Sequence, residues 1–88
     1  MQILFEESFE KDLKRIRDRK IKNRVKEIID EVRKAGNQQQ ISNLKKLKDY
    51  KTYYRIRVGD YRIGIEITEG KVIFTRFLHR KDIYKYFP

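Results

Sequence analysis

Residues 53–67 read YYRIRVGDYRIGIEI, and this stretch decides the fold. Apolar and polar side chains alternate on both sides of Gly59-Asp60, which predicts two strands joined by a tight hairpin turn. One face of the hairpin is then apolar and consists of Tyr54, Ile56, Val58, Tyr61, Ile63, Ile65 and Ile67. The other face carries Arg55, Arg57 and Arg62 beside Gly64. A core on one side and a cluster of like charges on the other are therefore expected.

The residues before the hairpin predict one strand and two helices. Residues 2–6 form a short apolar strand, and Ser8 after it is a candidate N-cap. Apolar residues then recur at helical spacing of three and four: Phe9, Leu13, Ile16, Ile21, Val25, Ile28, Ile29 and Val32. A turn at residues 18–20 separates the two helices, and Gly36 is the expected left-handed terminator of the second.

The remaining segments predict a loop, a further strand and an irregular tail. Residues 37–43 are polar without periodicity, and residues 44–48 are expected to connect to the hairpin, with a short helical turn possible there. Gly70 is expected at positive φ in a second turn, followed by a strand over residues 72–78. Residues 79–88 are expected to form no more than a turn.

The element order β-α-α-β-β-β predicts an α+β fold. A two-helix hairpin would pack on one face of a small, mainly antiparallel sheet. The helix residues Leu13, Ile16, Val25, Ile28 and Val32 would meet Ile56, Val58, Ile63 and Ile65. The opposite sheet face would be solvated and would present the arginines. The 88 residues fit one domain, residues 1–88.

Composition excludes several classes of site. There is no cysteine and one histidine, so neither disulfides nor a zinc site is expected. No Gly-rich phosphate loop precedes a helix, and we expect neither metal nor cofactor. No apolar run is long enough to cross a membrane, and the first residues do not resemble a signal peptide. A cytoplasmic protein is therefore expected.

The charge balance indicates a polyanionic partner. There are 23 Lys and Arg against 13 Asp and Glu, a net charge of +10. Such an excess in a small domain favours binding to nucleic acid. The alternative is a lysine-rich surface typical of proteins that work at high temperature.

The arginine face is the first candidate site. Arg57 and Arg62 would lie at or near a cross-strand pair, where like charges repel unless an anion lies between them. Guanidinium groups match phosphate with two hydrogen bonds, so phosphate is the expected anion. Alternatively, Asp60 and Glu66 pair with the arginines. Gly64 on the same face marks either the close approach of a ligand or another backbone, or else a bulge or a bulky neighbour that fills the space.

The tail supplies candidates for proton transfer. His79 is the only histidine, and imidazole exchanges protons near neutral pH. Arg80 could hold a phosphate, and Tyr84 could stack on a base or transfer a proton. A lone histidine is more often structural, whereas Tyr86 and Phe87 are more typical of a core edge.

Two motifs together resemble the RelE/ParE family of type II toxins, in particular archaeal and cyanobacterial RelE-like members. These are residues 54–63, YRIRVGDYRI, and residues 78–84, LHRKDIY. The resemblance covers essentially the whole chain, including Phe9-x-x-x-Leu13 and Leu44-x-x-Leu47. It implies a compact α+β toxin domain, a cognate antitoxin and, together with that antitoxin, operator DNA.

For RelE-type members the resemblance also implies cleavage of mRNA on the ribosome. Arg55 and Arg57 match the paired basic residues before the turn, and Arg62 matches the arginine after it. Arg80 and Tyr84 match the C-terminal arginine and tyrosine. The strand lysines of RelE are arginines here, and His79 could supply the missing proton carrier. Two alternatives stay open: a ParE-like inhibitor of DNA gyrase without nuclease activity, and a non-catalytic ribosome- or RNA-binding module.

Overall fold

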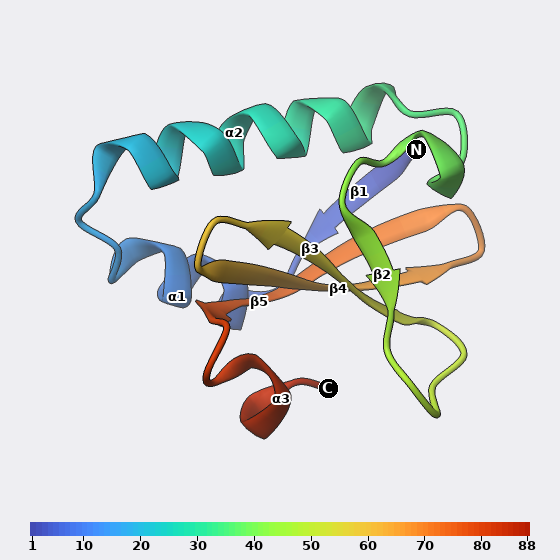
Figure 1. Ribbon diagram of the computed structural model, residues 1–88. Coiled ribbons are helices and arrows are strands. Elements are labelled where there is room, and N and C mark those ends of the chain that lie inside the picture. Colours follow the sequence, from blue (N-terminus) through green and yellow to red (C-terminus); the bar gives the residue numbers. More distant parts are fainter.

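The computed structural model describes residues 1–88 and consists of one five-stranded sheet with three α-helices and one short 3-10 helix (Figure 1). The elements are β1 (Gln2–Phe5), α1 (Glu7–Lys14), α2 (Arg19–Lys34), a 3-10 helix (Gln38–Gln40), β2 (Leu44–Lys46), β3 (Tyr53–Val58), β4 (Tyr61–Thr68), β5 (Lys71–His79) and α3 (Ile83–Tyr86). The strand order is β1-β5-β4-β3-β2. Only β1 and β5 pair in parallel. The predicted α+β class is confirmed.

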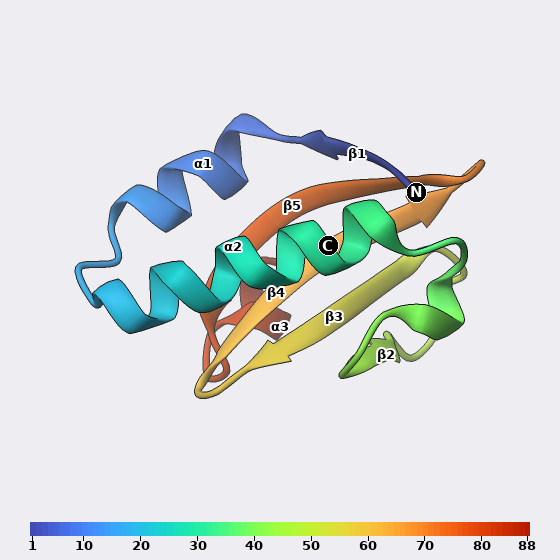
Figure 2. The same cartoon turned by 90° about the horizontal axis from the view of Figure 1, so that it is seen from above.

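The helices lie on both sides of the sheet. α2 crosses one face together with α1, whereas α3 lies under the other face (Figures 1 and 2). None of these helices combines the length and the apolar character that a membrane span requires.

Two short elements depart from the prediction. Residues 44–46 form the edge strand β2, because Leu44 pairs with Ile56 and completes the sheet beyond β3. The tail forms the one-turn helix α3 because Ile83 and Phe87 are buried. The order is thus β-α-α-β-β-β-β-α.

The predicted helix ends were also partly wrong. α1 begins at Glu7, and Ser8 does not cap it: its hydroxyl donates to the backbone oxygen of Thr75 at 2.6 Å. α2 begins at Arg19, because Asp18 caps it with its carboxylate. Gly36 does not adopt the left-handed conformation. The helix ends where Ala35 becomes extended.

The core between the helices and the sheet follows the predicted pattern. The hairpin residues Ile56, Val58, Ile63 and Ile65 are buried together with Phe9, Val25, Ile28 and Val32, and Leu13 and Ile16 pack against them. The β3–β4 turn contains Gly59 at φ +58°, and Gly70 has the expected positive φ of +75°. Both turns therefore use glycine where an L side chain would be strained.

The opposite sheet face is not fully solvated, which corrects the prediction. Leu47, Ile83 and Phe87 form a second, smaller core there, and Tyr53 and Leu78 pack against it. This second core fixes α3 beneath the sheet.

A buried ion pair fastens α1 to β5. The Asp12 carboxylate accepts from Nε and Nη2 of Arg76 at 2.7 and 3.1 Å, and from the backbone N–H of Phe77 at 3.0 Å. The hydrogen bond to Asp12 raises the pKa of the Arg76 guanidinium. The ion pair lies at a β-bulge, where Gly64 pairs with Arg76 but the next residue of β4 pairs with Phe74. The bulge bends the strand and shifts the later side chains of β5 to the other face.

Candidate active site

Three arginines project from the sheet face opposite to α2. Arg57 on β3 and Arg62 on β4 are directly opposed, and Arg55 lies opposite Gly64. The register is the one predicted from the hairpin turn. Like charges in this position repel each other, so the cluster is a natural place for an anion.

The neighbouring carboxylates do not neutralise the three arginines. None of the ion pairs in the protein includes them. Asp60 lies 3.7 Å from Nε of Arg80, and Glu66 accepts from the Thr52 hydroxyl at 3.0 Å. The alternative prediction, in which Asp60 and Glu66 pair with the arginine cluster, is therefore wrong.

Backbone oxygens hold two of the arginines in place. Nη1 of Arg62 donates to the carbonyls of Gly59 and Tyr61 at 2.8 and 2.9 Å. Nη1 of Arg55 donates to the carbonyl of Asn43 at 3.3 Å, whereas its Nε is buried without a partner. The guanidinium groups are thus oriented by neutral groups that leave their charge uncompensated.

The electrostatics of Arg62 show which tail residues lie near the cluster. Partial burial and the positive charges of Arg55 and Arg57 hold the pKa of Arg62 below its ordinary value. Arg80 lowers this pKa further, and Tyr84 acts in the opposite direction. Five of the six predicted site residues therefore lie within electrostatic reach of one another.

The tail is placed by its own contacts. The backbone N–H of Arg80 donates to the carbonyl of Asp60 at 2.7 Å, which joins the tail to the β3–β4 turn. Ile83 is fully buried and Phe87 is 3% exposed, so α3 is held against the sheet. Tyr84 between them is 63% exposed, and its phenol is accessible to a ligand.

His79 is the predicted residue that the fold sets apart. It is paired with Tyr61, and the two rings lie 5.5 Å apart. Tyr61 stacks on the core residue Phe77, so the rings of Tyr61 and His79 lie on the face that packs against α1 and α2. Leu78, not His79, lies opposite Arg62. The bulge causes this placement, because one extra residue in β5 reverses the side-chain alternation after it.

Gly64 is approached by a ring of the chain itself. A Cβ atom added at Gly64 would lie 2.8 Å from the ring of Phe87. Both parts of the structural explanation are found, because the Phe87 ring fills the space and a β-bulge lies between Gly64 and Ile65.

Gly64→Ala is expected to lower the free energy of unfolding by about 1–3 kcal/mol, because the added methyl group displaces Phe87 and α3. Urea denaturation measures this change. Gly36→Ala is the matched control, since its added Cβ meets no atom nearer than 3.6 Å. In a Phe87→Ala background the Gly64 substitution should become nearly neutral. An equal cost in both backgrounds would show that the clash is elsewhere.

Lys45 is a basic residue of this face that the sequence pattern did not indicate. On β2 this residue lies opposite Arg55 and extends the basic face by one strand. Leu44 beside it faces the core, so the apolar-polar alternation of these two residues was the only sequence pattern that could have indicated a strand. Three residues are too few for periodicity to reveal a strand.

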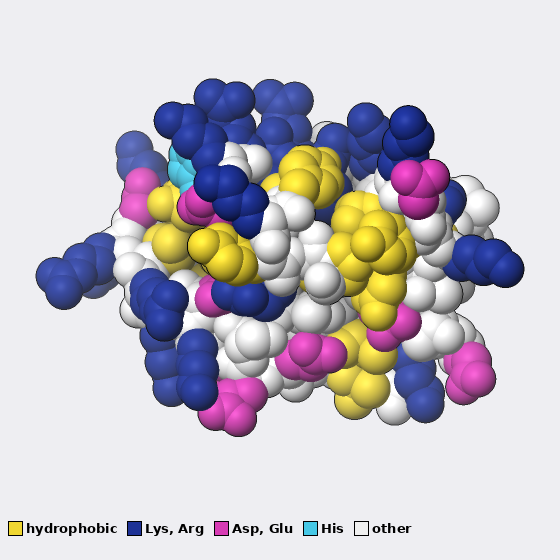
Figure 3. Space-filling model, turned by 90° about the horizontal axis from the view of Figure 1, so that it is seen from below, with side chains coloured by type: hydrophobic (Ala, Val, Ile, Leu, Met, Phe, Trp, Pro, Cys, Tyr) yellow, Lys and Arg dark blue, Asp and Glu magenta, His cyan; other side chains and the backbone are white.

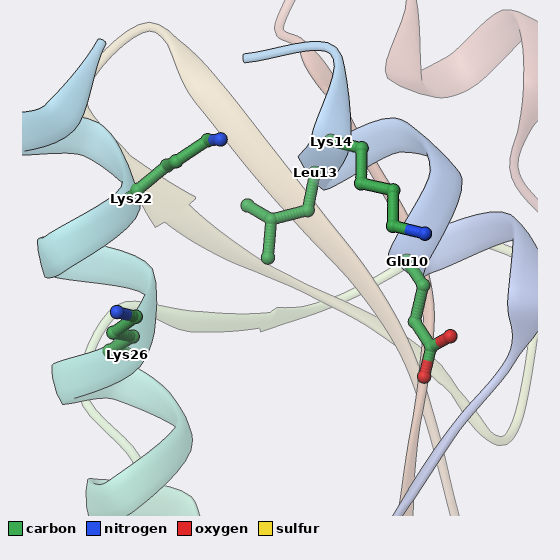
Figure 4. A pocket seen from close by; sticks show the side chains of 5 residues that line it. All are labelled: Glu10, Leu13, Lys14, Lys22 and Lys26. Carbon is green, nitrogen blue, oxygen red and sulfur yellow. The ribbon is translucent and has the colours of Figure 1, made fainter. Parts of the chain in front are cut away.

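A further basic region lies on the helix side. A hollow of about 390 Å³ between α1 and α2 is lined by Glu10, Leu13, Lys14, Lys22 and Lys26 (Figure 4). None of the six predicted site residues lines it. Lysine and arginine side chains also surround much of the α3 side of the molecule (Figure 3). The +10 charge is thus distributed over both sides.

Comparison with known proteins gives consistent matches over nearly the full chain. A family model described as "ParE toxin of type II toxin-antitoxin system, parDE" matches residues 3–84. The curated protein Toxin RelE3 of Methanocaldococcus jannaschii is 48% identical over 89 residues, with 100% of each chain covered.

Solved structures of similar proteins also match over nearly the full chain. The RelB-RelE antitoxin-toxin complex from Methanococcus jannaschii matches with a TM-score of 0.82 and 48% identity, covering 97% of this chain and 99% of that chain. The archaeal RelE-RelB complex from Pyrococcus horikoshii OT3 matches in fold, with a TM-score of 0.72, 18% identity and coverage of 90% and 93%. The protein therefore belongs to the RelE/ParE family of type II toxins.

Proposed function

We propose that this toxin inhibits translation as a metal-independent endoribonuclease that cuts mRNA on the ribosome. The observation that carries the proposal is the directly opposed pair of Arg57 and Arg62, joined by Arg55, with no carboxylate paired to any of the three. Arg80, which pairs with Asp60, lies within electrostatic reach of Arg62. A phosphodiester between these side chains would relieve their mutual repulsion. The 48% identity to a RelE toxin favours this activity over gyrase inhibition.

The reaction would be an internal transesterification. The 2′-oxygen of a ribose attacks the adjacent phosphorus, and the bond from phosphorus to the 5′-oxygen breaks. The products are a 2′,3′-cyclic phosphate and a 5′-hydroxyl. The 2′-hydroxyl proton passes to water, and the departing 5′-oxygen receives a proton from an acid of the site.

The arginines and the tyrosine would have different roles in this step. Negative charge grows on the phosphoryl oxygens in the transition state, and fixed cations stabilise it more than they stabilise the ground state. Arg62 suits this role because two carbonyls already orient it. Guanidinium groups keep their protons, so Tyr84 is the proposed acid that protonates the 5′-oxygen.

The partners follow from the charge. A net charge of +10 suits docking on ribosomal RNA. An acidic cognate antitoxin would cover part of the basic surface, as charge complementarity steers such pairs. The two archaeal relatives described above were solved as complexes with RelB, which supports this expectation. The pair would also bind operator DNA.

A translation assay with labelled mRNA tests the proposal. Cleavage is expected only when ribosomes are present, and it should continue in the presence of a metal chelator once the ribosomes are stabilised by polyamines. Addition of the antitoxin should leave the mRNA intact. Intact mRNA together with inhibited DNA supercoiling would contradict the proposal and support a gyrase inhibitor. Intact mRNA with ribosome binding and normal supercoiling would support a non-catalytic module.

A further inference from the structure

We propose that His79 is a positioning residue of this active site and not its proton carrier. In this view its Nδ1 atom holds the turn that brings Arg80 and Tyr84 to the arginine face. The inference rests on the proposed function, because it assigns the tail a part in RNA cleavage.

The location of the imidazole argues against proton transfer. A general acid or base must come within hydrogen-bond reach of the reacting atoms, directly or through one water. The His79 ring packs against Tyr61 on the face that carries α1 and α2. The arginines project from the other face of the sheet, where Arg62 is paired with Leu78 and not with His79, so the His79 side chain leaves β5 on the face opposite to the arginines. His79 instead borders a hollow of about 180 Å³, which Asp12 and Arg15 of the α1 region also line.

The hydrogen bonds of His79 indicate what it does. Its Nδ1 accepts from the backbone N–H of Lys81 at 3.1 Å, and its carbonyl accepts from the N–H of Asp82 at 2.8 Å. A backbone N–H can only donate, so Nδ1 carries no proton here. Side-chain acceptors that bind the N–H two residues ahead stabilise turns. His79 thus folds residues 79–82 into a turn at the end of β5.

This turn contains one of the two tail residues of the site and lies directly before the other. Arg80, inside it, is joined to the carbonyl of Asp60 at 2.7 Å. The buried Ile83 begins α3 immediately after it, and the exposed Tyr84 follows. If the turn opens, both Arg80 and Tyr84 lose their fixed positions relative to Arg62. A positional error of this kind lowers the rate without removing any reacting group.

Three substitutions separate the two roles. In His79→Asn the oxygen Oδ1 occupies the position of Nδ1 and can accept from Lys81. In His79→Gln the amide lies one bond farther out, at the position of Nε2, and His79→Leu retains bulk without any acceptor. None of the three side chains can carry a proton. If His79 carries a proton, all three variants should lose cleavage activity. If it only positions the turn, His79→Asn should keep this activity.

Two measurements are needed for each variant. The first is the rate of mRNA cleavage on programmed ribosomes as a function of pH. The second is hydrogen exchange of the Lys81 amide in the free protein, followed by NMR. For His79→Asn we expect cleavage within about twofold of wild type, an unchanged shape of the pH profile and a protected Lys81 amide. For His79→Gln and His79→Leu we expect loss of the protection and a loss of cleavage of about three- to tenfold.

Opposite outcomes overturn the inference. If His79→Asn keeps the Lys81 amide protected but loses as much cleavage as His79→Gln, the imidazole itself takes part in the chemistry. If the Lys81 amide stays protected in His79→Leu, Nδ1 does not hold the turn. If the wild-type protein cuts no RNA, the proposed function fails, while the exchange data still decide whether His79 positions the tail.

Discussion

Arg62→Ala is expected to lower the rate of mRNA cleavage by about 10²–10³-fold while the sheet stays folded. Arg62 is the most completely oriented cation of the cluster, with hydrogen bonds to two carbonyls and partial burial. A preorganised donor of this kind stabilises mainly the charge that develops in the transition state. The measurement is the single-turnover cleavage rate on ribosomes programmed with a defined mRNA.

Two controls separate this effect from a loss of charge or of fold. Arg17→Ala removes the same charge from the exposed α1–α2 connection and should change the rate by no more than about threefold. Arg62→Ala also removes the repulsion with Arg57, so its free energy of unfolding should be unchanged or about 0.5 kcal/mol higher. The phosphate-binding role would be refuted if Arg62→Ala cut mRNA at the wild-type rate. It would also be refuted if Arg17→Ala lowered the cleavage rate as much as Arg62→Ala does.

Asp12→Ala should cause the largest loss of stability, about 3 kcal/mol in the free energy of unfolding. Asp12 is 5% exposed and accepts three hydrogen bonds, two from Arg76 and one from the backbone of Phe77. Its removal leaves a guanidinium and a buried N–H without an acceptor. Urea denaturation monitored by circular dichroism measures the change.

A surface ion pair supplies the comparison. Asp30 lies 2.8 Å from Arg33, and both side chains are more than half exposed. Asp30→Ala should therefore cost less than about 0.5 kcal/mol. Replacing Arg76 together with Asp12 by apolar residues should recover part of the loss, since no charge is then left unpaired. A cost below about 1 kcal/mol for Asp12→Ala would mean that water replaces the carboxylate.

The parts of the fold that local periodicity determines could be predicted from the sequence. The alternation around Gly59-Asp60 set the β3–β4 register, and the spacing from Phe9 to Val32 set the inner faces of both helices. These patterns depend on residues close together in the chain. The arginine face could be predicted for the same reason, because it is the complement of the apolar face.

The errors come from interactions between distant segments. β2 has three residues and becomes a strand only because β3 offers it a free edge. The side of the sheet on which His79 lies depends on the bulge, and β5 is apolar on both faces, so its alternation does not reveal the extra residue. The burial of α3 depends on the space that Gly64 leaves for Phe87. None of these features has a local signature.

The parallel pairing of β1 with β5 also constrains the order of folding. The meander from β3 to β5 joins neighbouring segments and depends on no distant one, whereas Ile3 meets Val72 only after all the residues between them have been synthesised. The contact between α1 and β5 has the same requirement, because Asp12 and Arg76 are 64 residues apart. Domains fold as units during synthesis. The sheet of this toxin domain therefore stays incomplete until β5 has been synthesised.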